Sequence, residues 1–333
     1  MTSQRERLRM AWAVALKETI WTWSRHEPGP DKDIAIFSTR RSGSTWFMEL
    51  IAANRGVRYI DQPFSLHHPA PGHARELPLL SHSQFVELDP IERARVHSFL
   101  TRLLAGDLYV NAPWEPWHPT YHRRTNRSVL KIVDAKGLID WIDEVFAPHI
   151  LYSTRHPVPV ALSVLRNGWP LTAQAYLRSP SFVERHLDAQ TLDYCWRCLH
   201  EGTPLEQQVL NWGVENLEPL RLLGDRPHWT YIAYEDVVAE PERVTRHLAD
   251  VLNLHDLDRM QAQVRRASRS TRRLKSTAHA QPDATERLSA WRRHVSADEL
   301  RRAFDVLDRL GIDLYRPDHP FPTRARSVQA VDS

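Results

Sequence analysis

The sequence is poor in cysteine and in net charge. Its two cysteines, Cys195 and Cys198, cannot form a disulfide framework, and a zinc site would need a second pair of soft ligands at similar spacing, which is missing. We therefore expect two reduced thiols on one helix face. A formal net charge of +3 in 333 residues is too small a surplus to predict a nucleic-acid partner. It leaves room for a local anionic ligand.

Long apolar runs are also missing. The longest one near the N-terminus, "MAWAVAL", is well short of the roughly 20 residues that cross a bilayer, and no small-residue cleavage site follows it. This predicts a cytoplasmic protein without a transmembrane segment. Residues 1–28 have the pattern of an amphipathic helix with a basic face. Such a helix packs on its own domain, on a second subunit of a homodimer or on a membrane surface, and the first two are more usual.

What remains has the organisation of one α/β domain. Short apolar segments typical of strands occur at residues 33–39, 128–134, 149–154 and 228–234, and helical patterns at 137–146, 158–167, 190–224 and 240–252. This alternation predicts a P-loop-like three-layer fold, in which helices flank a central, mostly parallel sheet. We expect the core at residues 33–61 and 126–315, a proline-rich inserted cap of loops and short helices on the acceptor side at 62–125, and a loosely ordered tail at 316–333.

The segment "FSTRRSGSTWFMEL", residues 37–50, predicts an anion site. A strand, a turn of small residues and a helix N-terminus direct free backbone N–H groups and the helix dipole at a ligand. Gly43 permits close backbone approach, and Ser42, Ser44 and Thr45 add hydroxyl donors. Arg40 and Arg41 add positive charge. The alternative is that Ser44 or Thr45 only caps the helix and the arginines are solvated.

The loop that binds nucleoside triphosphates has a different pattern. It needs Gly-x-x-x-x-Gly-Lys-Ser/Thr, in which the lysine contacts the β- and γ-phosphates and the hydroxyl contacts magnesium. No Gly-Lys-Ser/Thr occurs in this chain. We therefore expect a ligand whose phosphate end is shorter than a triphosphate and which needs no metal.

A second anion site is predicted by "YSTRHPVPVALSVLRNGW", residues 152–169. A strand ends at Arg155, prolines open a helix, and Ser163 lies about one turn inside it. This can bring a guanidinium and a hydroxyl onto one phosphate group. Two anion sites imply a ligand with two phosphate-like ends.

Together these segments resemble sulfotransferases that use 3′-phosphoadenosine 5′-phosphosulfate (PAPS). "TRRSGSTW" resembles the 5′-phosphosulfate loop, including Trp46, in the form found in carbohydrate sulfotransferases, and "TRHPVPVALS" resembles the 3′-phosphate motif. "YIAYEDVVAEPERVTRHLADVLNL" resembles a Tyr-Glu-Asp-Leu segment whose tyrosine, here Tyr234, contacts adenine. Residues 287–315 resemble the closing helix of bacterial members, which would let Arg287 or Trp291 cover the nucleotide. The resemblance implies PAPS as co-substrate and a hydroxylated small-molecule acceptor.

The catalytic groups depart from the usual pattern of that family. Arg41 stands where a lysine commonly stabilises the leaving oxygen, as in relatives that act on carbohydrates or protein tyrosines. Lys131 in "LKIVDAKG" matches a lysine that binds the sulfuryl group, but Val133 holds the place of a catalytic histidine. In "YIDQPF", Gln62 replaces a candidate glutamate base.

The identity of the general base is therefore open between two carboxylates, Asp61 and Asp134, with further candidates in the cap. The cap candidates are His67, His68, Glu115 and His118. Trp114, Trp117 and Tyr121 in the cap are expected to pack structurally, with stacking on an acceptor as the alternative. The missing Gly-Lys-Ser/Thr disfavours a kinase, and the change at Gln62 leaves a non-catalytic anion- or polysaccharide-binding protein as the other reading.

Overall fold

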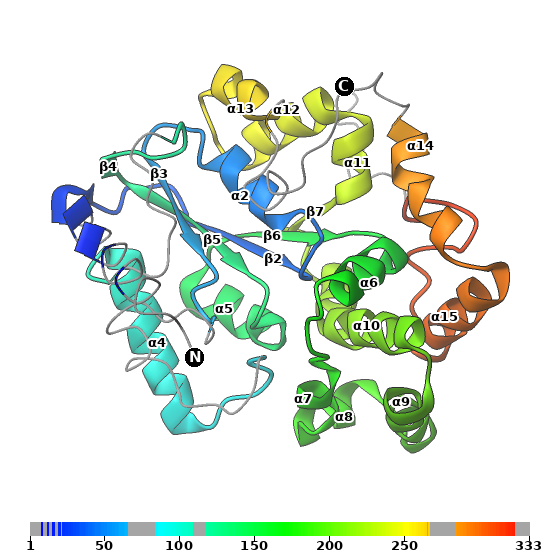
Figure 1. Cartoon of the computed structure of the whole chain (residues 1–333). Coiled ribbons are helices and arrows are strands. Elements are labelled where there is room, and N and C mark those ends of the chain that lie inside the picture. Colours follow the sequence, from blue (N-terminus) through cyan, green and yellow to red (C-terminus); the bar gives the residue numbers. More distant parts are fainter. Residues whose placement is uncertain are drawn as a thin grey trace.

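A five-stranded parallel sheet forms the centre of the molecule (Figure 1). The computed structural model describes residues 8, 12, 15, 16, 19, 20, 22–65, 84–108, 118–264, 266 and 284–323. The strand order is β3 (Val57–Asp61), β5 (Arg127–Ile132), β2 (Ile34–Ser38), β6 (His149–Thr154) and β7 (Thr230–Ala233). All neighbours pair in parallel. The predicted α/β class with a mostly parallel sheet is confirmed.

The sequence patterns predict β2, β5, β6 and β7 but miss β3. The missed strand lies at the edge of the sheet and carries the charged residues Arg58 and Asp61 at positions that are only partly buried. An edge strand lacks the continuous apolar run that marks a central one. Its short mixed sequence therefore gives little signal.

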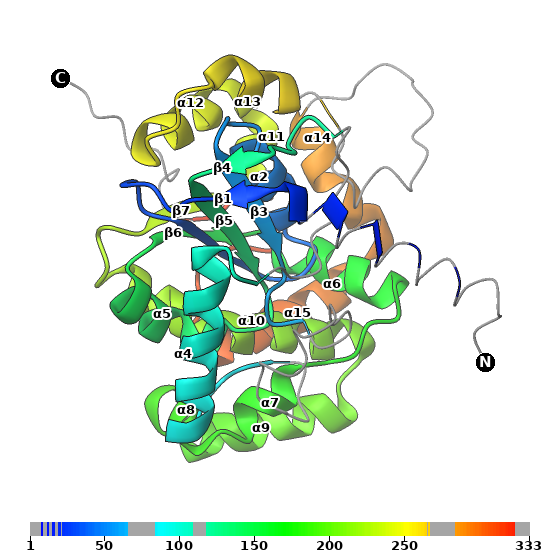
Figure 2. The same ribbon diagram turned by 90° about the vertical axis from the view of Figure 1, so that its left-hand side faces the viewer.

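Both faces of the sheet are covered by helices. Along β2, Ile34 and Ile36 join a core on one face, and Ala35 and Phe37 join a core on the other, as strand alternation requires. The first face is covered by α2 (Ser44–Ile51), α11 (Tyr234–Ala239), α12 (Pro241–Val251) and α13 (Leu257–Val264) (Figure 1). The second is covered by α4 (Pro90–Ala105), the 3₁₀ turn η1 (Lys136–Leu138) and α5 (Ile139–Phe146) (Figure 2).

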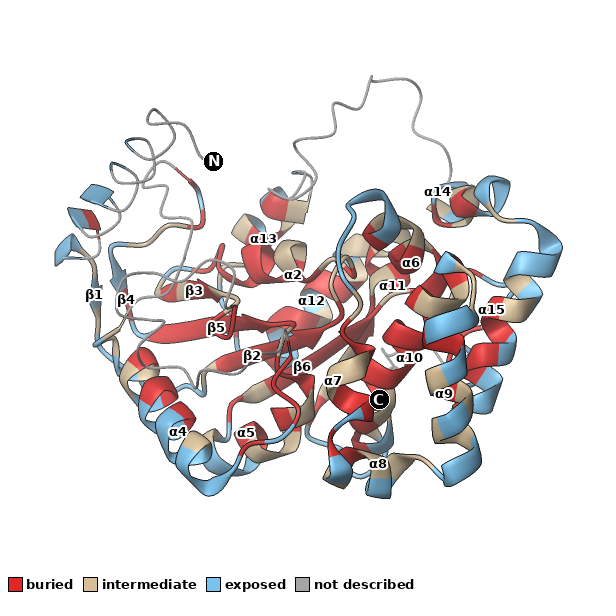
Figure 3. Cartoon of the chain, turned by 60° about the horizontal axis from the view of Figure 1, so that its bottom comes forward, coloured by how far each residue is buried: buried red, intermediate tan, exposed pale blue. Residues whose placement is uncertain are grey.

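A helical subdomain packs beside the end of the sheet that β6 and β7 form. At its centre α10 (Pro204–Leu223) packs on α6 (Pro157–Arg166) and on α15 (Ala297–Arg309). Figure 3 shows that the middle of α10 is buried among its neighbours. The smaller elements around it are α7 (Ala173–Leu177), α8 (Pro180–His186), α9 (Ala189–Glu201), α14 (Ala284–Ser289) and η2 (Ala290–His294).

The helix predicted over residues 190–224 is in fact two helices. α9 ends at Glu201, and Thr203 then caps α10 by accepting the Glu206 backbone N–H, while the Glu206 side chain accepts the Thr203 N–H. Pro204 occupies the first turn, where its missing N–H costs nothing. This capping box starts a new helix, so the prediction of one continuous helix is wrong.

The predicted boundaries of the N-terminal helix and the cap also differ from the structure. Arg25–His26 form a strand, β1, which pairs with β4 (Arg124–Thr125) rather than continuing a helix to residue 28. Residues 90–105 form the sixteen-residue helix α4 instead of short helices, and its apolar side, which includes Val96 and Phe99, is part of the core. Residues 316–323 of the predicted tail are described, and Thr323 donates its N–H to Leu314 across 2.7 Å. Among the described residues, no helix has the length and apolar character needed to cross a membrane.

Candidate active site

The two predicted anion-binding segments lie side by side at the carboxyl edge of the sheet. The loop of residues 39–43 follows β2, and Arg155 follows the neighbouring strand β6. From β2 the chain crosses to the β3 side of the sheet, and from β5 it returns across β2 to β6. A crevice at such a reversal of strand order is where open α/β sheets bind ligands.

The loop has a backbone shape that exposes its N–H groups. Arg41 and Gly43 both have left-handed φ angles, of 67° and 86°. Gly43 is the N-cap of α2, and no side chain caps this helix end. The N–H groups of Ser44 and Thr45 are therefore available to an anion, which the helix dipole also attracts, whereas the Trp46 N–H donates to the Gly43 carbonyl across 2.8 Å.

Gly43 packs closely against the aromatic ring of Tyr234. A Cβ atom at position 43 would lie 2.5 Å from Cδ2 of Tyr234, closer than any side chain tolerates. Tyr234 opens α11 just after β7, and Arg155 lies over its ring at 4.4 Å from the centroid. Tyr234 therefore joins the loop to the second anion-binding segment.

Arg41 links the same two segments by direct hydrogen bonding. Its Nε donates to Ser163 Oγ across 3.0 Å, and Arg155 Nη1 donates to the Arg41 carbonyl across 3.1 Å. Arg41 also lies over the Trp169 ring at 5.6 Å. Burial and the nearby charges of Arg155 and Arg166 lower the pKa of Arg41. No described carboxylate forms a direct ion pair with Arg41 or Arg155, although the buried Glu235 lies near enough to Arg155 to interact with its charge.

Several buried polar atoms at this edge have no partner among the described residues. They are Ser42 Oγ, Ser153 Oγ, Arg155 Nε and Arg40 Nη2. Ser153 pairs with Ser38 in the register of β2 and β6, directly below the loop. Buried polar groups are nearly always hydrogen-bonded, and each exception needs an explanation. Ser42 Oγ and Arg155 Nε lie in the two predicted anion-binding segments and fit an anion with several oxygen acceptors, whereas the Arg40 guanidinium faces Asp134.

Lys131 connects the loop to a carboxylate. Its Nζ lies 2.5 Å from Asp61 Oδ1 and donates to Thr45 Oγ1 across 3.1 Å. Asp61 and Lys131 are register partners on β3 and β5, and Thr45 is in the first turn of α2. The side chain of Asp61 is 22% exposed, which leaves it accessible from solvent.

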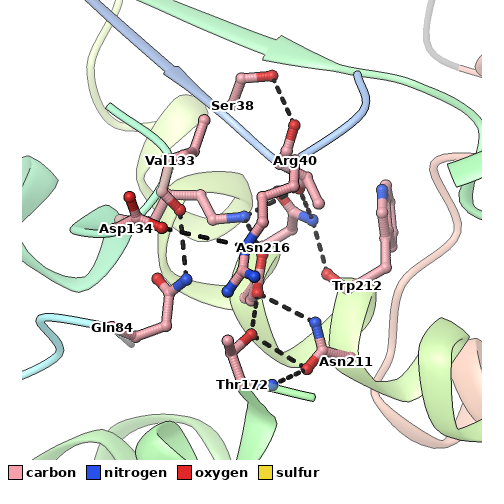
Figure 4. Close-up of polar contacts among 12 residues, drawn as sticks. Ser38, Arg40, Gln84, Val133, Asp134, Thr172, Asn211, Trp212 and Asn216 are labelled. Atoms are coloured by element: carbon pink, nitrogen blue, oxygen red, sulfur yellow. Dashed lines mark hydrogen bonds and ion pairs between the residues drawn. The ribbon is translucent and has the colours of Figure 1, made fainter. Parts of the chain in front are cut away.

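The other carboxylate candidate lies on a different side of the loop. Asp134 Oδ1 is 4.0 Å from Arg40 Nε (Figure 4), and neighbouring Val133 accepts a hydrogen bond from Gln84. Gln62 follows Asp61 with a left-handed φ of 53°. The structure thus separates the two candidates, placing Asp61 with Lys131 and Asp134 with Arg40.

The remaining predicted residues differ in how near they lie to the loop. Ser44 is buried at the start of α2, and Trp46 packs edge-on against Phe47. Arg287 is exposed on α14. Trp291 is buried and packs on the His156 ring, with centroids 4.7 Å apart, so it lies behind Arg155 in the core rather than over the loop.

Most cap candidates lie outside the described residues. These are His67, His68, Trp114, Glu115 and Trp117. His118 is described and buried, and its ring bonds Thr120. Its neighbour His122 bonds the Ala52 carbonyl, at the opposite end of α2 from the loop. Arg259 also holds Pro119, next to His118, at the same end of α2, so His118 lies away from the loop.

Two features of the site escape sequence reasoning. Trp169 lies in the segment quoted for Ser163, but nothing in its spacing indicates that it contacts Arg41. Glu235 follows Tyr234 and is buried, where it accepts hydrogen bonds from the His156 N–H (2.8 Å) and the Tyr315 hydroxyl (3.0 Å). Burial raises the pKa of Glu235 to about 7, even though these donors and Arg155 oppose the shift.

Two sizeable surface hollows lie away from the loop. One of about 710 Å³ and one of about 700 Å³ border α15, where ion pairs such as Arg301–Asp305 line the surface. They contain none of the orphaned donors described above. Chemistry rather than size therefore identifies the loop as the candidate site. In the described part of the chain, no three His, Cys, Asp or Glu side chains gather as metal ligands.

The chain matches no protein-family model and no curated protein. Some solved structures are similar to it over 87% of its length. The sulfotransferase domain from the curacin biosynthetic pathway is 18% identical, covered over 100% of its own length, at a TM-score of 0.43. The sulfotransferase domain from the Synechococcus PCC 7002 olefin synthase is 16% identical, is covered over 98% of its own length and has a TM-score of 0.45. Mouse sulfotransferase SULT7A1, complexed with PAP, is 15% identical, is covered over 87% of its own length and has a TM-score of 0.40. These values are too low to decide a function.

Proposed function

We propose that this protein is a sulfotransferase that moves a sulfuryl group from PAPS to a hydroxyl of a small-molecule acceptor in the cytoplasm. The observation that carries the proposal is the contact of Arg41 with both Ser163 and Arg155. It brings two anion-binding segments, far apart in the sequence, to one end of the sheet. A nucleotide with one phosphate-like group at each end matches that arrangement.

The donor set at the site fits such a nucleotide. Ser42 Oγ and Arg155 Nε, one in each of the two segments, are buried and have no hydrogen-bond partner among the described residues. Tyr234 lies between the segments, in contact with Gly43 and Arg155, and offers an aromatic face to a base. We assign residues 40–46 to the 5′-phosphosulfate and Arg155 and Ser163 to the 3′-phosphate. Arg287, exposed on α14, stays a weaker candidate for covering the nucleotide.

When bound, PAPS supplies an activated sulfuryl group, and the protein's residues do the rest. The acceptor oxygen forms a new S–O bond as the bond to the 5′-phosphate breaks. Arg41 stabilises the charge that develops on the leaving phosphate, since a guanidinium stays protonated and offers parallel donors. Lys131, fixed by Asp61 and Thr45, orients the sulfuryl oxygens.

We assign the general base to Asp61. It lies against Lys131, which reaches the loop through Thr45, whereas Asp134 faces Arg40 on the other side. The acceptor proton passes to the Asp61 carboxylate as the new bond forms. The acceptor class that fits an open, polar site is a carbohydrate, a lipid or a specialised metabolite.

A transfer assay with ³⁵S-labelled PAPS across these acceptor classes tests the proposal. We expect label to move to at least one hydroxylated acceptor without added magnesium. A protein that binds PAP tightly yet transfers label to no acceptor would instead be a binding module. Magnesium-dependent consumption of ATP would indicate a kinase.

A further inference from the structure

A buried ion pair that the proposed mechanism does not use lies beneath the loop. Lys136 Nζ is 2.6 Å from Glu215 Oε2, and the two side chains are 0% and 1% exposed. Burial by itself would raise the pKa of Glu215, but Lys136 and Arg40 hold it below its ordinary value, so the carboxylate is ionised. Because desolvation offsets most of the attraction in such a pair, stability alone is a weak explanation for it.

One arm of this pair reaches the start of the loop. Lys136 Nζ donates to Thr39 Oγ1 across 2.9 Å, and Asn216 Nδ2 donates to the same oxygen across 2.9 Å. Tyr152 in turn donates to Asn216 Oδ1. Thr39 is 3% exposed and immediately precedes Arg40. The Thr39 hydroxyl therefore links the start of the loop to the buried residues Lys136 and Asn216 by hydrogen bonds.

The other arm reaches the segment that carries Trp169. Glu215 Oε1 accepts hydrogen bonds from Thr172 Oγ1 and, across 3.0 Å, from Asn211 Nδ2. Asn211 Oδ1 accepts the backbone N–H groups of Thr172 (2.6 Å) and Ala173 (2.8 Å). Figure 4 shows Thr172 and Asn211 below Arg40 and Asn216 in this network. Only Pro170 and Leu171 separate the fixed backbone at Thr172 from Trp169, which faces Arg41.

We propose that Glu215 and Lys136 are positioning residues that fix the anion loop and the 169–173 segment relative to each other. The two oxygens of one carboxylate serve the two segments, so Arg41 keeps its place between Ser163 and Trp169. The inference rests on the proposed function only in taking residues 40–46 as the donor-binding element. Neither residue touches the reacting groups.

Hydrogen exchange in the ligand-free protein tests the two arms separately. Thr39→Val removes one hydroxyl at nearly constant shape, and we expect exchange of amides 40–45 to rise by about tenfold, the effect of losing one buried hydrogen bond. Thr172→Val should raise amide exchange in residues 168–174 by a similar factor and leave exchange in the loop unchanged. Lys136→Met with Glu215→Leu, which leaves no unpaired buried charge, should affect both segments.

Matched controls separate positioning from general destabilisation. Thr245→Val removes a buried hydroxyl on α12 that bonds the Pro241 carbonyl (2.6 Å), and it should lower the melting temperature without changing exchange in either segment. Thr39→Ser retains the hydroxyl and should restore slow exchange in the loop. Thr39→Val and the double variant should also weaken PAP binding by about tenfold.

Wild-type exchange in both segments of the double variant would overturn the inference. So would equal loosening of the whole domain by Thr39→Val and Thr245→Val. A wild-type protein that does not bind PAP would refute the proposed function instead, and the exchange results would still decide whether the pair positions the loop.

Discussion

Arg155 Nη1 donates a hydrogen bond to the carbonyl oxygen of Arg41 across 3.1 Å, although 114 residues separate them. The contact exists because β2 and β6 are parallel neighbours, so the residues that follow them meet at one edge. With Ser163 on Arg41 Nε, it makes a single cationic cluster from two distant segments. The predictions below test what this cluster does.

Replacement of Arg41 by alanine should remove most of the transfer activity and leave the fold intact. Arg41 is partly buried beside two other arginines and forms no ion pair with a described carboxylate. Loss of a group that stabilises transition-state charge lowers kcat by roughly 100-fold or more. Turnover is measured with labelled donor, and the fold is checked by circular dichroism. Unchanged turnover in a folded variant removes Arg41 from the mechanism.

A methyl group at position 43 should disrupt donor binding. Gly43→Ala combines a φ of +86° with a Cβ 2.5 Å from the Tyr234 ring, so either the ring or the loop must move. We expect PAP affinity to fall by at least about tenfold, since displaced donors no longer match the anion.

Gly311→Ala is the matched control for backbone strain. Its φ of +68° imposes a similar strain, but nothing lies within 4 Å of the added Cβ. It should cost about 1 kcal/mol of stability, the usual penalty for a left-handed residue with a side chain, and leave PAP binding unchanged. If both variants bind PAP equally, contact of Gly43 with Tyr234 is not part of the donor site.

The two carboxylate candidates are separable by kinetics. Asp61→Asn should lower kcat by about 100-fold or more, as expected for a general base, with little change in PAP affinity. Asp134→Asn, which leaves the Lys131 pair intact, should retain most of the activity. The reverse outcome, with the larger loss of kcat at Asp134, would transfer the role of base to Asp134.

Glu235 should make stability depend on pH near neutrality. Burial raises its folded-state pKa to about 7, so its contribution to folding is fully present below about pH 4.5 and is lost as the pH rises to about 7. The wild type should lose on the order of 3 kcal/mol relative to Glu235→Gln across that range.

The neighbouring His156 has the opposite effect on the pH dependence of stability, and it is present in both the wild type and Glu235→Gln. Burial lowers its pKa to about 3, so its contribution is present above about pH 6.5 and is lost on acidification. Comparing denaturation of the wild type and Glu235→Gln at pH 5 and pH 8 therefore isolates Glu235. Parallel stability curves for the two proteins would show that Glu235 does not titrate in this range.

The sequence predicts the central strands and the loop because their signals are local. The apolar run before Thr39 and the small residues after it indicate a strand, a turn and a helix without reference to the rest of the chain. The order of the segments at the sheet edge then follows from parallel topology. The sequence did not predict β3, because an edge strand of five residues with Arg58 and Asp61 has no such local signal.

The polar network beneath the loop depends on contacts that no local pattern encodes. Lys136 lies in a short turn after β5 and Glu215 in the middle of α10, 79 residues further on. A helical position such as Glu215 is predicted to face solvent unless its partner is known. Trp291 shows the converse, since its position in an arginine-rich segment suggests a surface role but packing on His156 places it in the core.

Titration calorimetry with 3′-phosphoadenosine 5′-phosphate (PAP) tests the central claim most directly. We predict one site per chain, binding of PAP tighter than that of adenosine 5′-phosphate, which lacks the 3′-phosphate, and loss of that preference in Arg155→Met and Ser163→Ala. Equal binding of the two nucleotides by the wild type, or an unchanged preference in both variants, would contradict the account.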